Sequence, residues 1–521
     1  MTPRWAQWVP WVLLGGFSAL WLARWVSFPL FIDPYYHLMV AQQVADAGGP
    51  IAYEWWEAAP EGRPHLYPPA IHLVIAGLLA LGFSPLTAIR LVSAVLPALT
   101  LLTIYLAARR LFNPAVALAA LLMAFVPFSW MLQTAHGMAS AVAGIELLWL
   151  LVSVCERRWI AAASWVGLLF YTHLGLPWIG LAAIGVGLLV NAFAPHPKLL
   201  ASLGAGILLG APWLWHLAAH RGLLQITARQ ENRSLEIAVP LYLLACFGVW
   251  RAWRQRGRPR VLIALWVACA LMAPAFTARW LSGEGLLPAI LLAGYGLERA
   301  SGLLQKVPGT FPRTKSTWYF LNIVAGGALV MACPSLRVGR DGPRLLWPES
   351  VPFHLLYWKG VERKPLDAQL YASQTRQLAD SAAQLTQPGE ILWANANYAG
   401  GIVAVLAHRA TSSAMFYEAL PGRERDPIAS AHLILWFKVD PIPGVPPLEV
   451  LIDRYRLQAV AETPVARIYR NPAAPRRSHA PVAVIPWWMA FVLSCGLIGG
   501  TQWEKLRRFS SAATRRKRGS R

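Results

Sequence analysis

The amino-acid sequence predicts a polytopic α-helical membrane protein that carries a C-terminal α/β domain outside the membrane. The 521 residues are 56% hydrophobic and only 14% charged, whereas a soluble chain has about 25% charged residues. The apolar residues are also grouped in long blocks. These blocks have the length of roughly 17–25 residues that a helix needs to cross the hydrocarbon core.

The net charge of +22 would suggest nucleic-acid binding in a soluble protein. The basic residues, however, are spread between the apolar blocks and are not gathered in one domain, which is the distribution that membrane topology favours. We therefore expect no nucleic-acid partner. The five cysteines show no paired spacing typical of a disulfide framework or a zinc site.

Twelve membrane spans are expected along the chain. They lie near residues 8–28, 85–108, 113–131, 137–154, 159–174, 176–194, 199–218, 237–253, 261–277, 284–299, 317–334 and 482–502. No small-residue cleavage site follows the first block, so we interpret it as a retained signal anchor. The apolar segment at 70–83 is a candidate for lying in the membrane interface.

Lysine and arginine are concentrated in one set of alternate loops. That set includes Arg109–Arg110 and Arg157–Arg158, whereas the other set is richer in acids. The positive-inside rule makes the first set cytoplasmic. We therefore expect a multi-pass protein of the plasma (inner) membrane, with its first loop and C-terminal domain outside and its tail in the cytoplasm.

The predicted organisation has four parts. They are a transmembrane domain at 1–335 with a first outer loop at 31–69, a soluble α/β domain at 336–480, a last helix at 481–503 and a basic cytoplasmic tail at 504–521. In the soluble domain, helical spacing is present over 367–385. Strands are expected at 390–393, 433–438 and 465–469.

The first outer loop has the densest chemistry of the sequence. Asp33 follows the first span and precedes a proline, and Tyr36 and His37 come directly after it. A carboxylate held at a membrane surface beside aromatic residues and a histidine is suited to act as a base, or as a metal ligand, towards a lipid-linked substrate. The alternative is that Asp33 caps the helix that follows, with the aromatic residues forming an interfacial belt.

The order of motifs in this loop is more specific than any one of them. The run contains Asp33-Pro-Tyr-Tyr-His-Leu, Glu54-Trp-Trp, Pro60-Glu-Gly and Tyr67-Pro-Pro, and it ends near Ala76. It resembles the first external loop of the catalytic subunit of oligosaccharyltransferase and its archaeal and bacterial relatives, within the GT-C class of glycosyltransferases.

Two further stretches are similar to the same family. The segment that begins Arg279-Trp-Leu-Ser-Gly-Glu-Gly resembles the one whose arginine is associated with the lipid pyrophosphate. The segment Ile391-Leu-Trp-Ala-Asn-Ala-Asn-Tyr resembles the strand and turn that carry the family's Trp-Trp-Asp-Tyr-Gly motif.

The resemblance implies an inverting, oligosaccharyltransferase-like enzyme with a GT-C-like fold of about twelve spans. Such an enzyme transfers a sugar or oligosaccharide from a polyprenyl-phosphate-linked donor to an acceptor outside the membrane. Asp33 is then expected to activate the acceptor or to hold Mg or Mn. Arg279, with His37 and Tyr36, is expected to bind the donor phosphate. An arginine at the outer end of a span suits bidentate phosphate binding on physical grounds as well, although it can instead snorkel to the interface.

The acceptor side departs from the family pattern. The candidates there are Trp393, Asn395, Asn397 and Tyr398, so an amide replaces the acid of the motif. Glu231, in the loop at 220–234, is a further candidate, unless that loop is simply solvated and paired with its own arginines. These differences argue against glycosylation of a protein sequon.

The second outer loop departs from the family pattern too. It has no acid-x-acid metal motif, and its first acid is Glu146, well inside the next span. His136 is the substitute candidate for a metal ligand, with an interfacial hydrogen bond as the alternative.

Two other functions stay open. The chain could be a GT-C-fold membrane protein that has lost its chemistry, or a transporter of a lipid-linked or polar substrate. No internal repeat of the kind that many transporters carry is present. The sequence leaves open the sugar, the acceptor, the metal requirement and the oligomeric state.

Overall fold

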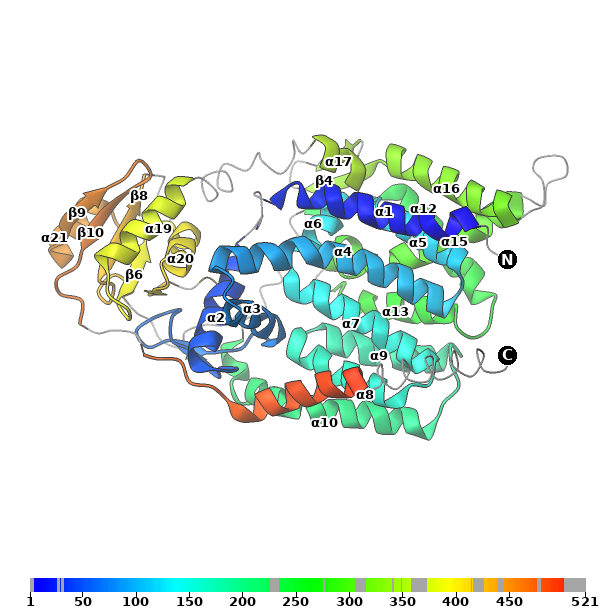
Figure 1. Cartoon of the computed structure of the whole chain (residues 1–521), viewed down its shortest axis with the longest axis horizontal. Helices are drawn as coiled ribbons and strands as arrows, with labels where there is room; N and C mark the ends of the chain where they lie inside the picture. Colours follow the sequence, from blue (N-terminus) through cyan, green and yellow to red (C-terminus); the bar gives the residue numbers. More distant parts are fainter. Residues whose placement is uncertain are drawn as a thin grey trace, which may run out of the picture.

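The computed structural model describes residues 4–25, 29, 32–224, 234–274, 277–304, 315–339, 342–347, 349–357, 373–413, 415, 426–438, 444–475 and 479–500. These residues form a bundle of helices with an α/β domain at one end, and the first outer loop lies between the two (Figure 1).

The bundle contains helices of very different lengths. They are α1 (Arg4–Leu22), α4 (Pro85–Leu111), α5 (Pro114–Ala124), α6 (Phe128–His136), α7 (Met138–Cys155), α8 (Trp159–Thr172), α9 (Leu176–Leu189), α10 (Pro197–Ala219), the 3-10 turn η2 (Arg221–Leu223), α12 (Val239–Trp253), α13 (Arg260–Ala270), α14 (Thr277–Ser282), α15 (Leu286–Leu304), α16 (Lys315–Ala332), α17 (Val351–Tyr357) and a last helix at Ile485–Gly500.

Capping residues define where the bundle helices begin. The Ser84 side chain accepts a hydrogen bond from the Thr87 amide at the start of α4. The Asn113 side chain accepts two, from Ala115 and Val116, at the start of α5. A proline occupies the first turn of both helices, where its missing N–H has no intrahelical partner to lose.

Three helices, α4, α7 and α10, are long and apolar enough to cross a membrane by themselves. α5 and α6 meet the same criterion only together, and they are bent by 86°. The span expected at 113–131 is therefore not one straight helix, because Pro127 cannot continue α5. Further apolar helices in the described part of the chain, among them α8, α9, α12 and α13, are only 10–17 residues long, so the count of twelve spans stays a prediction.

Basic side chains meet at the end of the bundle that lies away from the α/β domain. Arg110 and Arg158 both pair with Glu156, at 3.2 and 3.6 Å. Arg260 donates a hydrogen bond to the Val190 carbonyl at 2.7 Å. The N-terminus lies at this same end (Figure 1). Arg110, Arg158 and Arg260, three of the residues that the positive-inside rule assigns to the cytoplasm, thus lie at or next to the ends of bundle helices.

The first outer loop folds into α2 (Asp33–Ala47), the short hairpin of β1 (Tyr53–Glu54) and β2 (Arg63–Pro64), and α3 (Ala70–Ala80). Residues 34–44 of α2 are all buried, which is unusual for a loop outside a bundle. They share one hydrophobic core with the outer ends of α4 and α7 and with the C-terminal domain. The loop is therefore a layer between the bundle and the domain.

The C-terminal domain is a five-stranded sheet in the order β7-β6-β8-β10-β9. Its elements are β6 (Ile391–Ala394), β7 (Ala410–Thr411), β8 (Leu433–Phe437), β9 (Gln458–Glu462) and β10 (Ala466–Arg470), with helices α19 (Ser373–Leu385), α20 (Asn397–Leu406) and α21 (Leu448–Tyr455). β6 is parallel to β7 and β8, and β10 is antiparallel to its neighbours. β6, β8 and β10 lie where the sequence predicts strands.

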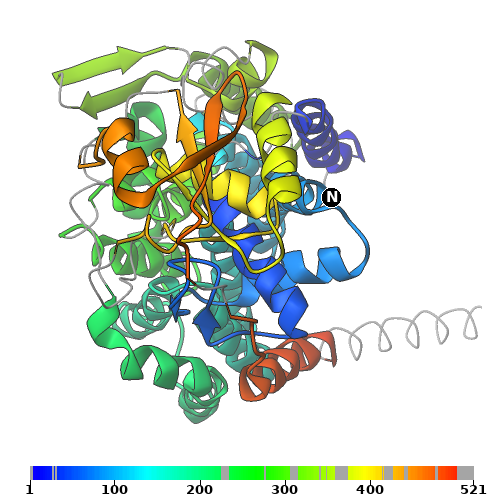
Figure 2. The same cartoon turned by 90° about the vertical axis from the view of Figure 1, so that its left-hand side faces the viewer.

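A second sheet lies apart from this domain. It pairs β3 (Ser234–Ala238) with β4 (Ser335–Gly339), and β4 with β5 (Gly342–Leu346). Figure 2 shows the β4–β5 hairpin in light green, projecting from the side of the molecule. β4 and β5, which lie almost wholly in the range that the sequence assigns to the soluble domain, thus form one sheet with β3, the strand that leads into α12.

The outer loop extends the edge of the five-stranded sheet. The Thr411 amide donates to the Trp56 carbonyl at 2.7 Å, and the Ala59 amide donates back to the Thr411 carbonyl at 3.0 Å. The Gln42 side chain of α2 donates to the Val405 carbonyl of α20. These main-chain contacts fix the position of the loop on the domain.

Candidate functional site

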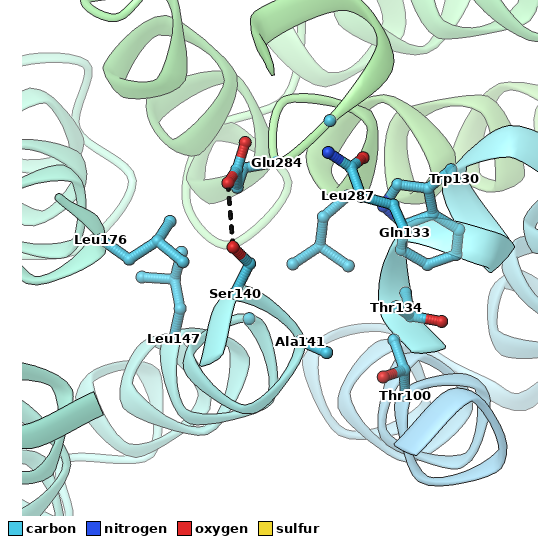
Figure 3. A pocket seen from close by; sticks show the side chains of 12 residues that line it. Thr100, Trp130, Gln133, Thr134, Ser140, Ala141, Leu147, Leu176, Glu284 and Leu287 are labelled. Carbon is cyan, nitrogen blue, oxygen red and sulfur yellow. Dashed lines mark hydrogen bonds between the residues drawn. The ribbon is translucent and has the colours of Figure 1, made fainter. Parts of the chain in front are cut away.

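A small cavity lies at the outer end of the bundle, where the α6–α7 turn faces the turn between α14 and α15. Its volume is about 40 Å³. Figure 3 shows Glu284 and Ser140 on one side, Gln133, Trp130, Thr134 and Thr100 on the other, and Leu287 between them. The remaining lining residues are Ala141, Gly144, Leu147, Leu176 and Gly283.

Glu284 is presented to this cavity by a turn that only glycine can form. It stands between Gly283 and Gly285, whose amides both donate to the Arg279 carbonyl, at 3.0 and 3.1 Å. A Cβ atom on Gly285 would lie 1.9 Å from the Trp280 carbonyl oxygen. The close approach of the two chain segments therefore requires glycine at position 285.

A directed chain of hydrogen bonds ends on Glu284. His173 Nδ1 accepts the amides of Gly175 and Leu176, at 3.0 and 3.2 Å, and so caps the start of α9. The hydrogen of the neutral ring is then on Nε2, which lies 3.3 Å from Ser140 Oγ and donates to it. The Ser140 hydroxyl donates in turn to Glu284 Oε1 at 3.2 Å.

Arg279 lies beside the same carboxylate. Its Nη1 atom is 3.7 Å from Glu284 Oε1, and the Arg279 side chain is 29% exposed while that of Glu284 is 8% exposed. The guanidinium thus lies next to one lining residue of the cavity and still reaches the surface. A cation in this position can hold a phosphate at the membrane surface.

A second polar group lies in the outer loop and is closed to solvent. Arg63 is fully buried between the carboxylates of Glu54 and Glu57. Glu54 also accepts hydrogen bonds from the Tyr36 hydroxyl, at 2.9 Å, and from the His65 ring. Although burial alone would raise it, the pKa of Glu54 is lowered, because Arg63 and the His65 hydrogen bond stabilise the charged form.

Histidines from α2 and α3 meet next to this group. His37 Nδ1 lies 2.9 Å from His72 Nε2, so one ring donates to the other. Burial, aided by the nearby His65, lowers the pKa of His37 to about 3. The two rings are therefore neutral neighbours that join α2 to α3.

The residues that were expected to bind the donor come from two parts of the structure. Arg279 lies in α14, beside Glu284, whereas Tyr36 and His37 are 4% and 2% exposed and form hydrogen bonds inside the outer loop. Burial, followed by the nearby charge of Glu54, raises the pKa of Tyr36.

Asp33 is exposed in the first turn of α2. It is not among the residues that line the cavity. The residue at the N-cap position of α2 is Ile32, and Asp33 follows it as the first residue of the helix. Its role as a base or metal ligand stays a prediction.

Two of the acceptor-side candidates, Trp393 and Asn395, contribute to the five-stranded sheet. Trp393 is buried in β6. The Asn395 side chain donates to the Phe437 carbonyl at 3.0 Å and accepts the Phe437 amide at 2.7 Å, so it extends the pairing of β6 with β8. Tyr398 is 39% exposed near the start of α20. Asn397 begins α20 but its side chain lies outside the described set, as does all of Glu231.

The two candidate metal ligands, Asp33 and His136, come from α2 and α6. His136 Nδ1 is bonded to the Leu132 carbonyl of its own helix at 2.8 Å. Within the described ranges, no group of three or more His, Cys, Asp or Glu side chains is arranged to hold a metal ion. A requirement for Mg or Mn stays a prediction.

Sequence reasoning gave no role to Glu284, Ser140 or His173. Glu284 could have been singled out from the sequence, because a carboxylate between two glycines at the outer end of a span is an unusual arrangement. No sequence pattern singles out Ser140 or His173, because each acquires its role only through contacts between α7, α8 and the α14–α15 turn.

Part of the chain matches a known family. Residues 67–216 match the model of the dolichyl-phosphate-mannose-protein mannosyltransferase family. This stretch runs from the end of the outer loop through most of α10, which is less than half of the chain. No curated protein matches the whole sequence significantly.

Solved structures resemble this one over nearly its whole length. ArnT from Cupriavidus metallidurans, solved in the apo state, covers 89% of this chain and 98% of its own at 16% identity, with a TM-score of 0.54. The same protein bound to undecaprenyl phosphate gives the same coverage and TM-score at 14% identity.

Two further structures extend the comparison. Archaeal oligosaccharyltransferase AglB from Archaeoglobus fulgidus, in complex with an inhibitory peptide and a dolichol-phosphate, covers 84% of this chain and 70% of its own at 11% identity, with a TM-score of 0.51. Arabinofuranosyltransferase AftD from Mycobacteria covers 92% of this chain and 42% of its own at 13% identity, with a TM-score of 0.54. The chain therefore has the GT-C fold of membrane glycosyltransferases, the class that its first outer loop resembles.

Proposed function

We propose that this protein is a membrane glycosyltransferase that takes a sugar from a polyprenyl-phosphate carrier and transfers it to an acceptor on the non-cytoplasmic side. The observation that carries the proposal is the position of Arg279. Its guanidinium lies beside Glu284, a residue that lines a cavity at the outer end of a GT-C bundle, and stays partly exposed. A lipid phosphate at headgroup depth would meet it there.

The fold comparison supports a lipid-linked donor. ArnT was solved with undecaprenyl phosphate and AglB with a dolichol-phosphate, and both share the fold of this chain. The transfer breaks the bond between the sugar and the phosphate, so negative charge develops on the leaving phosphate. A preorganised cation in a site of low dielectric stabilises such charge more than water does.

The arrangement of charges supports the proposed side of the reaction. The outer loop lies at the end of the bundle that faces the α/β domain, and α4, which begins near that loop, ends in the basic turn of Arg109 and Arg110 at the opposite end (Figure 1). The positive-inside rule makes that other end cytoplasmic.

Purified protein incubated with sugars linked to undecaprenyl phosphate or dolichyl phosphate tests the proposal. We expect release or transfer of the sugar, and a donor KM that rises about 10–100-fold in Arg279→Ala, because a hydrogen bond to a charged group contributes about 1.5–3 kcal/mol. The donor KM of Arg279→Lys should lie between those of the wild type and Arg279→Ala. Lysine keeps the positive charge but lacks the planar guanidinium that binds phosphate through two hydrogen bonds.

The matched control is Arg337→Ala. Arg337 is an exposed arginine of β4 that pairs with Glu236 and does not line the cavity, and its loss should leave the donor KM unchanged. The proposal fails if the wild type and Asp33→Asn behave identically, with neither protein turning over any of the carriers in the presence or absence of Mg or Mn. That result would favour a protein that keeps the fold without the chemistry.

A further inference from the structure

The sheet of β3, β4 and β5 has one apolar face. In an antiparallel sheet, residues that lie directly opposite each other point to the same side. The apolar face that the register defines contains Ile237, Leu336, Val338, Pro343 and Leu345. The opposite face carries Glu236, Arg337 and Arg344. The sheet is therefore amphipathic, like an element that lies between two different media.

The apolar face of this sheet is open. Leu345 is 68% exposed, and Val338 and Pro343 are exposed as well. Trp347, the residue that follows β5, is 67% exposed. Neighbouring apolar side chains that stay exposed mark a surface that contacts another protein or a membrane.

The sheet lies at the ends of two apolar helices. β3 runs directly into α12, and β4 begins at Ser335, shortly after α16 ends at Ala332. The far end of α12 carries Arg251, and α16 begins at Lys315. These basic ends are the ones that the positive-inside rule assigns to the cytoplasm. The sheet is therefore expected at the outer surface of the membrane.

The sheet extends sideways from the bundle. The bundle helices run horizontally in Figure 1, and Figure 2, which looks along them from the side of the α/β domain, shows the β4–β5 hairpin projecting beyond the bundle. The β3 edge is fixed to α14, because the Glu236 amide donates to Ser282 Oγ at 3.1 Å and the Ser282 hydroxyl donates to the Glu236 carbonyl at 2.8 Å. An element fixed in this way at the ends of membrane helices runs along the membrane surface.

The apolar face adjoins the lipid-facing side of α16. The exposed side chains of Phe320, Val324 and Met331 recur at helical spacing and form one stripe along that helix. At the end of the stripe, the Trp347 indole donates a hydrogen bond to the Ala332 carbonyl at 3.2 Å. Tryptophan is enriched where hydrocarbon meets water. The hydrocarbon that covers the stripe of α16 can therefore cover the neighbouring face of the sheet too.

We infer that the β3–β5 sheet is an interfacial membrane anchor. Its apolar face is buried among the acyl chains of the outer leaflet, and Arg344, on the opposite face, lies at the level of the headgroup phosphates. Arg337 is paired with Glu236 within the sheet. The inference assigns β4 and β5 to the membrane surface instead of the soluble domain. It does not depend on the proposed function, because it concerns lipid contact and not sugar transfer.

Spin labels on single cysteines test whether lipid covers this face. The protein is reconstituted in vesicles of phosphatidylethanolamine and phosphatidylglycerol and labelled at Leu345→Cys or at Arg344→Cys. Oxygen concentrates in hydrocarbon, whereas a polar nickel chelate stays in water. We expect the ratio of oxygen collisions to nickel collisions to be at least about fivefold higher at position 345 than at position 344, since apolar solutes partition from water into an apolar medium.

The chain offers matched controls for this measurement. Val324 of α16 and Val450 of α21 are both 50% exposed. The label at Val324→Cys should give the same high ratio as Leu345→Cys, and the label at Val450→Cys should give the low ratio of a site in water. The background protein lacks the native cysteines that are not buried, which are Cys155, Cys246 and Cys495. Without an introduced cysteine it should take up no label.

A photoactivatable phospholipid tests the same contact in the wild-type protein, so the answer does not depend on how a cysteine variant folds. After illumination and digestion, mass spectrometry should find lipid adducts on residues 342–347 as well as on α16. Peptides from α21 should carry none, because that helix belongs to the α/β domain.

Two results would overturn the inference. A collision ratio at position 345 as low as that at Val450→Cys would show that water covers the face. A label that meets neither reagent, together with a hairpin that carries no lipid adduct in the wild type, would show that protein covers it. Either result leaves the proposed function standing, and a protein that transfers no sugar could still give every expected collision ratio and adduct.

Discussion

Arg63 is a charged side chain with no access to solvent, held between Glu54 and Glu57 in the outer loop. Burying one charge is costly, but here the two carboxylates compensate the guanidinium. Tyr36 and His65 complete the group through their hydrogen bonds to Glu54. The pKa of Arg63 is raised, because Glu57 and Glu54 outweigh the effect of its burial. The loop thus depends on charges that must stay paired.

Replacing Arg63 with methionine should therefore destabilise the protein. The change keeps apolar volume but leaves two buried carboxylates uncompensated, and breaking a buried pair costs about 3–5 kcal/mol. We expect a lower unfolding midpoint in an SDS titration of the protein in mixed micelles. Arg337→Met removes a half-exposed partner of Glu236 and should cost no more than about 1 kcal/mol. Equal losses of stability in Arg63→Met and Arg337→Met would contradict a stabilising role for the pairing of Arg63 with the two carboxylates.

At the scale of elements, α2 and α3 are held together by neutral histidines. The fragment from Asp33 to Tyr67 has the spacing of a helix followed by turns, but its sequence does not show that His37 meets His72, 35 residues later. The pairing puts two titratable rings in a core where protonating both is unfavourable. α2 and α3 should therefore separate more easily in acid.

The pH dependence of stability follows from the sign of this shift. The pKa of His37 is about 3 in the folded protein, mainly because of burial, against 6.5 for an ordinary histidine. The stabilising contribution is present in full above pH 6.5 and is lost as the pH falls from 6.5 towards 3. We expect unfolding midpoints that are level between pH 8 and 6.5 and then fall, by up to about 1.4 kcal/mol per pH unit for one proton.

His37→Phe provides the comparison for this prediction. It removes one titrating ring, so the fall below pH 6.5 should become shallower, although the variant is less stable at pH 8 because His72 loses its partner. A slope that is identical in the two proteins would show that other groups cause the acid sensitivity.

At the scale of the whole molecule, the sequence predicts the arrangement of helices and strands better than it predicts the contacts between side chains. Long apolar blocks predict the bundle, and alternating strands predict β6, β8 and β10, because both depend on local periodicity. The cavity depends on pairs far apart in the chain, such as Ser140 and Glu284, which are 144 residues apart. Asn395 resembles a motif residue by position, yet its contacts with Phe437 give it a structural role that no local pattern reveals.

The contact between the outer loop and the domain should behave as one unit. The Thr411 amide, bonded to Trp56, should be protected from hydrogen exchange in the wild type. In Arg63→Met, protection at Thr411 and Ala59 should fall together, while Ile468 in the central ladder stays protected. Arg337→Met should leave all three amides protected. Unchanged exchange at Thr411 in Arg63→Met would mean that the loop charges do not support the domain.

The hydrogen bond from the Met415 amide to Glu57 joins groups 358 residues apart in the chain. At about 5–20 residues per second, synthesis reaches Met415 roughly 20–70 s after Glu57. During that interval the loop carries paired charges and an unmatched strand edge, while the helices from α4 onward are still being synthesised. The first outer loop is thus among the first parts of the protein to be made and among the last to be finished, so a nascent chain that stops before residue 411 leaves it without its partner.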